Sequence, residues 1–254
     1  LPDEENEMIP RRLSAITTIL ILLALSACGS KVPVKRYYSL QNDSLAAVVN
    51  APICAKPLVI AAVEADPPYD FRKIAFRTGG FEIKHYYFRL WSSAPSDMLK
   101  RLLMRRLRLA NLFVTTDTYV HSVSDHLALY ATIYAIEELN EAKGEQWFAH
   151  LAMEFRLRDS RTERVVWEHR FDSRRPVVEK TSIQMVKQLS AIYNDEMKAM
   201  LAKLHVFLKG YADCGQAKSV EEPATTPAAE NAPQEATAPT AFEANSADAA
   251  SDGG

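Results

Sequence analysis

The sequence predicts an α/β domain of the α+β type, with a mostly antiparallel sheet on which one short and one long C-terminal helix pack. Several segments alternate apolar and polar residues, as strands do, and turn residues such as glycine, proline and aspartate separate them. Two other segments repeat apolar residues every three or four positions, which is typical of amphipathic helices. The longer of these lies near the C-terminal end of the apolar part of the chain.

The first strands are marked by their turns. Residues 57–63 form an apolar run that ends at the turn sequence Asp66-Pro67-Pro68, which predicts a buried strand. Residues 72–77 and 81–88 flank Gly79-Gly80, and this arrangement predicts a hairpin with a tight turn.

A short helix should follow, beginning within residues 93–97 and ending at Asn111. Its apolar face consists of Met98, Leu99, Leu102, Leu103 and Leu107. Residues 112–115 predict a strand, and residues 127–139 predict a central strand because both of its faces are fairly apolar.

The clearest hairpin lies further along the chain. Residues 147–157 alternate apolar and polar side chains, residues 159–162 supply a turn, and residues 165–171 continue the alternation.

The last element is a helix over residues 178–209, and Ser190 is the polar member of its apolar seam. The seam consists of Ile183, Val186, Tyr193, Met197, Met200, Leu204 and Phe207. We expect this helix to lie across the sheet, and pairing of the seam with another subunit is the alternative.

An export signal precedes the domain. Arg11 and Arg12 are followed by an apolar run too short to span a bilayer, and residues 25–28 (LSAC) match a lipobox. The pattern predicts that Cys28 becomes the first residue of the mature chain and carries diacylglycerol and an N-acyl chain, with no other cofactor. A transmembrane or plain secretory segment with a chance cysteine is the alternative. Met8 is the expected start.

These features divide the chain into four parts. They are a signal peptide over 1–27, an acylated tether over 28–56, a folded domain over 57–214 and a disordered tail rich in Ala, Pro and Glu over 215–254. Residues 36–40 form a further strand that could join the domain.

Two cysteines remain after acylation, Cys54 and Cys214. Export to an oxidising compartment predicts a disulfide between them, worth about 4 to 5 kcal/mol in the chain-entropy model. A zinc site is the less favoured alternative.

Composition and motifs argue against several function classes. The formal net charge of -2 does not indicate a nucleic-acid binder. Residues 121–126 (HSVSDH) are the one local cluster of catalytic residue types, but no nucleophile elbow, phosphate loop or established metal spacing accompanies them. We therefore expect no enzymatic activity and no metal site. A surface metal between His121 and His126, or a hydrolase using Ser124, is the alternative.

Several short motifs occur together in a particular order. They are the lipobox, YYSL at 37–40, the strand at 58–63, IAFR at 74–77, and YYFRLW at 86–91 leading into the helix that begins with SDML at 96–99. In this order and spacing the chain resembles the ABC-type transport auxiliary lipoproteins over about residues 36–207. The acidic tail has no expected counterpart in that family.

The resemblance implies a non-catalytic domain, anchored at the periplasmic face of the outer membrane of a Gram-negative bacterium. Its implied partners are an MCE-domain protein and the permease and ATPase of an ABC lipid transport system, and it could form a homo-oligomer. Gly29 after the lipidated cysteine agrees with export to the outer membrane. A lipoprotein chaperone or plug for envelope assembly is the alternative.

Candidate interface residues come from three places. Tyr37, Tyr38 and Leu40 follow the tether, and Arg77 and Trp91 occupy positions that the resemblance implies are an Arg and a Trp. Arg101, Arg105 and Arg108 share one side of the first helix by their spacing and could meet phospholipid headgroups or an acidic partner. Packing in the core or a solvated surface is the alternative for each group.

Overall fold

The computed structural model describes residues 33–43, 48–119, 125–141 and 145–215. These residues all belong to one compact unit. The signal peptide, Cys28, residues 121–124 of the histidine-containing cluster and the tail beyond residue 215 lie outside the described residues. Within the described ranges, neither helix combines the length and apolar character needed to cross a membrane.

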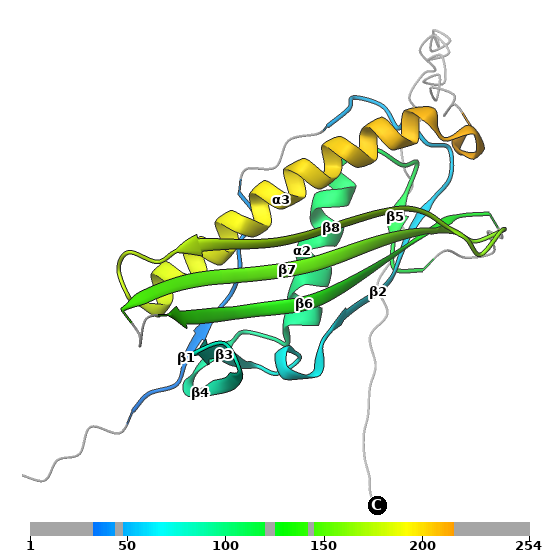
Figure 1. Cartoon of the computed structure of the whole chain (residues 1–254). Coiled ribbons are helices and arrows are strands. Elements are labelled where there is room, and N and C mark those ends of the chain that lie inside the picture. The colour runs from blue at the N-terminus through cyan, green and yellow to red at the C-terminus, as the bar shows by residue number, and fades with distance from the viewer. Residues whose placement is uncertain (1–32, 44–47, 120–124, 142–144, 216–254) are drawn as a thin grey trace, which may run out of the picture. The chain divides into compact units, whose positions relative to one another are not determined.

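The described chain contains eight strands and two α-helices (Figure 1). The strands are β1 (Arg36–Tyr38), β2 (Leu58–Ala65), β3 (Lys73–Thr78), β4 (Glu82–Trp91), β5 (Thr116–Asp117), β6 (Leu127–Glu141), β7 (Gln146–Asp159) and β8 (Val165–Pro176). The helices are α2 (Pro95–Ala110) and α3 (Ser182–Gly210), with short 3-10 turns η1 (Pro67–Tyr69) and η3 (Ala212–Cys214).

The sheet confirms the predicted fold class, but it is mixed. β6, β7 and β8 pair antiparallel along most of their length, and β3 and β4 form the predicted hairpin around Gly79 and Gly80, whose φ angles are positive. Among the described strands, β1 with β4, β2 with β5, and both β2 and β3 with β6 are parallel pairs. Residue alternation identifies a strand but not its neighbour, which is why these parallel pairs were not predicted.

One edge of the long strand β6 is shared by two shorter strands. β2 pairs with its first half, from Leu127 to Ile133, and β3 pairs with its second half, from Glu137 to Asn140. Between them the chain leaves the sheet as η1, because two consecutive prolines cannot donate the hydrogen bonds that a strand requires. This interruption positions Tyr69 beside β6.

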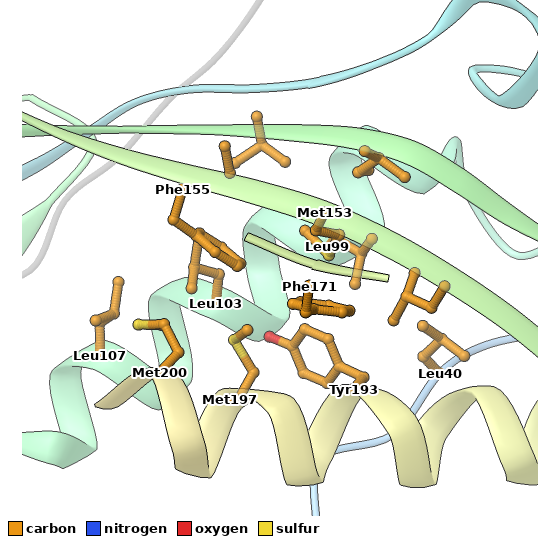
Figure 2. Packing of buried hydrophobic residues seen from close by; sticks show 14 of the residues in the cluster. Leu40, Leu99, Leu103, Leu107, Met153, Phe155, Phe171, Tyr193, Met197 and Met200 are labelled. Atoms are coloured by element: carbon orange, nitrogen blue, oxygen red, sulfur yellow. The ribbon is translucent and has the colours of Figure 1, made fainter. Parts of the chain in front are cut away.

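Both helices pack on the same face of the sheet, and α3 lies lengthwise along β7 and β8 (Figure 1). In the core, Leu103 of α2, Phe155 of β7 and Met197 of α3 meet (Figure 2). The prediction that this helix packs against the sheet is confirmed. Its start is four residues later than predicted, because the Thr181 side chain caps the helix by accepting a hydrogen bond from the Gln184 N–H.

Three smaller expectations have mixed outcomes. Asn111 ends α2 as predicted, in a left-handed conformation with φ of 56°. The predicted strand over 112–115 is wrong: β5 is Thr116–Asp117, and Phe113 forms only an isolated bridge with Cys54. Ile183 is also not a core residue, because 56% of it is exposed.

The two ends of the domain are joined. Cys54 and Cys214 form a disulfide with a Cα–Cα distance of 4.7 Å. Nearby, the Lys56 ammonium lies 2.8 Å from a carboxylate oxygen of buried Asp159, at the turn between β7 and β8. Asp159 also accepts hydrogen bonds from the backbone of Arg161 and Thr162. The N-terminal segment, the β7–β8 turn and the C-terminal segment are therefore held together.

Candidate functional site

The helices leave the other face of β6, β7 and β8 uncovered, and we call this surface the open face. Cross-strand register places alternate side chains of the three strands on it. Its polar and aromatic residues include Tyr130, Tyr134, Glu137, His150, Glu154, Arg156, Arg158, Glu168, Arg170, Asp172 and Arg174. The Arg158 guanidinium lies 5.3 Å from the Tyr130 ring centroid, and that of Arg170 lies 4.9 Å from the Tyr134 ring centroid.

At one end of the open face, a hollow of about 310 Å³ has a buried carboxylate in its wall. Glu137, only 1% exposed, accepts hydrogen bonds from the Tyr69 hydroxyl at 2.9 Å and the Arg77 Nε at 3.3 Å. The Arg77 Nη2 also donates to the Tyr69 hydroxyl at 2.7 Å. His150 places its Nδ1 3.0 Å from Glu137 and its Nε2 2.9 Å from Asp172. We call these five residues the Glu137 network.

The network keeps Glu137 ionised. Burial opposes its charge, but hydrogen bonds from His150 and Tyr69 and the charge of Arg77 outweigh burial and hold its pKa below the usual value. The same burial, together with the adjacent Glu137 charge, raises the pKa of Tyr69 to about 12. Tyr69 is therefore a neutral hydrogen-bond donor at physiological pH.

The members of the Glu137 network hold one another in place through hydrogen bonds. None of the described residues that line its hollow is a serine, threonine or cysteine, so the usual nucleophiles of acyl transfer do not occur there. Across the described ranges, no group of three or more His, Cys, Asp or Glu side chains has a metal-binding arrangement. Each charged member faces an oppositely charged or hydrogen-bonding partner.

Arg77 and Trp91, the two positions that the resemblance implies are an Arg and a Trp, occupy different environments. Arg77 belongs to the Glu137 network, and its Nη1 also donates to the Gly80 carbonyl. Trp91 is 1% exposed and packs in the core, as does Leu40 at 2%. Leu40 and Trp91 therefore contribute to packing in the folded domain.

Tyr37 and Tyr38 lie on β1, which pairs with the end of β4. The Ser92 N–H donates to the Tyr38 carbonyl, and this bond ties the segment before the domain to the sheet. Tyr38 is half-buried, whereas 57% of Tyr37 is exposed. Tyr37 is thus the member of this pair with surface available to a partner.

The three arginines predicted to share one side of α2 do line one hollow, of about 630 Å³, together with apolar Met104 and Leu109. Arg108 is committed to local partners, because it donates to the Thr116 carbonyl and pairs with Asp117. Arg101 donates to the Ser93 hydroxyl, and Arg105 is exposed. An interface role for these three arginines remains a prediction.

Sequence reasoning missed Tyr69, Glu137 and His150. One signal was present: Glu137-Glu138 interrupts an otherwise apolar central strand, and buried carboxylates need partners. Glu138, on the helix side of the same strand, accepts a 2.7 Å hydrogen bond from Tyr86, and burial raises its pKa. The two acidic side chains therefore lie on opposite faces of β6, Glu137 on the open face and Glu138 on the helix side.

The profile of a family described as an ABC-type transport auxiliary lipoprotein component matches residues 38–200. A crystal structure from Xanthomonas campestris, a protein assigned to the family DUF330, is similar with 16% identity and a TM-score of 0.58, over 68% of this chain and 96% of that one. The crystal structure of an uncharacterized protein gives 16% identity and a TM-score of 0.52, over 67% and 99%. No curated protein matches the sequence. At such identities these structures show a shared fold only.

Proposed function

This chain belongs to the family of ABC-type transport auxiliary lipoprotein components, and from that premise we propose that it docks an MCE-type lipid transport system at the periplasmic face of the outer membrane. Membership associates the chain with an ABC transport system and with a membrane-anchored location in the cell envelope. The MCE-domain partner, the lipid cargo, the outer membrane and acylation of Cys28 are our proposal. In this role the chain catalyses nothing, and ATP is hydrolysed by another subunit.

The open face is the observation that carries the docking role. Its tyrosines and arginines are the residue types enriched at protein interfaces, and the helices leave them accessible. Arg170 and Arg174 are exposed on β8. We therefore propose that the open face binds the MCE-domain protein through these tyrosines and arginines.

The Glu137 network supports this role by fixing the shape of the surface. Arg77 from β3, Glu137 from β6, His150 from β7 and Asp172 from β8 are joined by hydrogen bonds across four strands. A surface fixed in this way loses less conformational freedom on binding, and this lowers the entropic cost of association.

The proposal is tested with the acylated protein purified from membranes, carrying the photo-crosslinking residue p-benzoylphenylalanine at Arg170. The same residue at Lys203, on the exposed side of α3, is the matched control. Mass spectrometry should identify an MCE-domain protein crosslinked at position 170 and not at 203. Crosslinking of a β-barrel assembly protein at position 170 would instead support the chaperone or plug alternative, and overturn the transport proposal.

Charge reversal gives a second test in cells. Arg170→Glu with Arg174→Glu should reduce recovery of the partner and increase detergent sensitivity, whereas Lys203→Glu with Lys209→Glu should change neither. Both pairs alter the net charge equally on exposed residues. Equal recovery of the transport proteins with both variants would place the docking surface elsewhere.

A further inference from the structure

We infer that a second surface, at the β1 edge of the sheet, rests directly on the anionic phospholipid headgroups of the membrane that holds the lipid anchor. We call it the aromatic-basic patch, and it consists of Lys35, Tyr37, Phe71, Arg72, Lys73 and Tyr87. β1 and β8 are the two ends of the strand path β1-β4-β3-β6-β7-β8, so this patch is at the opposite edge from the β8 arginines of the open face.

The patch exposes large aromatic side chains beside cations. Tyr37 and Phe71 are each 57% exposed, and Tyr87 is 66% exposed. The Arg72 guanidinium lies 5.5 Å from the Tyr37 ring centroid, and the Lys73 Nζ lies 5.3 Å from that of Tyr87. Lys35, Tyr37 and Phe71 also line one hollow, of about 520 Å³. An aromatic ring with a cation beside it suits the headgroup level of a bilayer, where apolar and charged surroundings meet.

The charge around the patch is positive. Lys35, Arg36, Arg72 and Lys73 are all exposed. The nearest acid along the chain, Asp70, already accepts a hydrogen bond from the Ser96 hydroxyl. His85, which also lines the hollow, has its Nε2 2.8 Å from the Pro68 carbonyl. The Arg72 guanidinium also donates hydrogen bonds to the Trp91 and Ser92 carbonyls, so Lys35, Arg36 and Lys73 are the cations proposed to meet lipid phosphates.

The short segment between Cys28 and Lys35 places the patch near the membrane. Seven residue steps separate Cys28 from Lys35 in the sequence, and a fully extended chain of that length spans at most about 25 Å. The 29 residues of α3 extend about 43 Å. Because this segment is shorter than the domain, an acylated Cys28 would keep the β1 edge close to the bilayer surface.

These observations favour lipid over a protein partner. A protein can dock anywhere on the domain, but the anchor restricts one edge to the vicinity of the bilayer, and that edge is the one with exposed aromatic and basic side chains. Each lysine or arginine near an anionic surface strengthens binding about fivefold. The patch would thus hold the domain in one orientation above the membrane.

Photo-crosslinking tests the contact in the acylated full-length protein, reconstituted in vesicles of phosphatidylethanolamine and phosphatidylglycerol. With p-benzoylphenylalanine at Phe71, we expect mass spectrometry to find a phospholipid adduct. The same residue at Val206, which is 72% exposed on α3, should give none. Equal lipid adducts at both positions, or none at Phe71, would overturn the inference.

Vesicle binding measures the contribution of charge. The full mature chain with Cys28→Ser lacks the anchor, so its co-sedimentation with the same vesicles reports the domain's own affinity. Lys35→Glu with Lys73→Glu should weaken binding at least about tenfold, whereas Lys203→Glu with Lys209→Glu should leave it within twofold. A loss caused instead by Arg101→Glu with Arg105→Glu would assign lipid contact to α2 and refute the patch.

The inference depends on acylation of Cys28 and not on the identity of the transport partner. The mass of the lipidated N-terminal peptide establishes acylation separately. A missing lipid crosslink at Phe71 would leave the open-face proposal unaffected, and a missing MCE-domain partner would leave the membrane contact unaffected.

Discussion

Removing the Cys54–Cys214 disulfide should lower the free energy of unfolding by about 3 to 5 kcal/mol. The bridge joins residues 160 positions apart, and the chain-entropy relation for a loop of that size gives about 17 cal/mol/K, or about 5 kcal/mol at 25 °C. Residual structure in the unfolded chain reduces this figure. Since domains are typically stable by about 5 to 15 kcal/mol, much of the stability depends on one bond.

The assay is urea unfolding of the mature chain carrying Cys28→Ser, followed by tryptophan fluorescence. Alanine is the suitable replacement, because Cys54 and Cys214 are 0% and 2% exposed and serine would bury unpaired hydroxyls. Reduced protein and the Cys54→Ala, Cys214→Ala variant should lose similar amounts, with a larger urea dependence. If both lose less than about 1.5 kcal/mol, loop closure does not stabilise the domain as the chain-entropy model requires.

Two further predictions concern buried polar groups. Burial opposes the charge of Asp159, but hydrogen bonds from Lys56, Thr162 and Arg161 lower its pKa in the folded protein. The ionised carboxylate therefore stabilises the fold fully above its pKa in the unfolded chain, which is about 4, and this stabilisation is lost as the pH falls from that value toward the lower pKa of the folded protein. Urea unfolding between pH 7 and pH 3 should therefore show decreasing stability, and Asp159→Asn should flatten that dependence while costing about 3 kcal/mol at pH 7; an unchanged slope would contradict this. The Tyr193 hydroxyl is fully buried, and none of the residues that the structure describes is its hydrogen-bond partner, so Tyr193→Phe should raise the unfolding free energy by about 1 kcal/mol and the Tm by about 3 °C; a decrease in Tm would show that the hydroxyl is satisfied.

The amino-acid sequence alone predicted most of the helices and strands and the family, because both depend on local sequence patterns. The 3.6-residue repeat of Tyr193, Met197, Met200 and Leu204 identified a helix whose buried side faces the sheet, and these four residues are buried. Their burial is a direct consequence of spacing along one chain segment.

Local sequence patterns gave wrong predictions where the conformation of a segment depends on a second segment of the chain. Residues 112–115 have the composition of a strand, but the backbone around Leu112 and Phe113 is hydrogen-bonded to the Cys54 segment. In β6, an irregularity between Ile133 and Ala135 changes which face later residues occupy, so alternation from Leu127 could not place Glu137.

The candidate site was predicted only in part for the same reason. Arg77 and Tyr37 were proposed as interface residues from sequence, yet Arg77 meets Glu137 and His150 only because β3 and β7 flank the same strand.

Sequence by itself therefore determined the class of the domain, its helices and most strands, the family and the predicted lipid anchor, since each depends on residues close together in the chain. Only the tertiary structure decided the parallel pairs, the Glu137 network and the aromatic-basic patch, because each joins segments whose approach depends on the packing of the whole sheet.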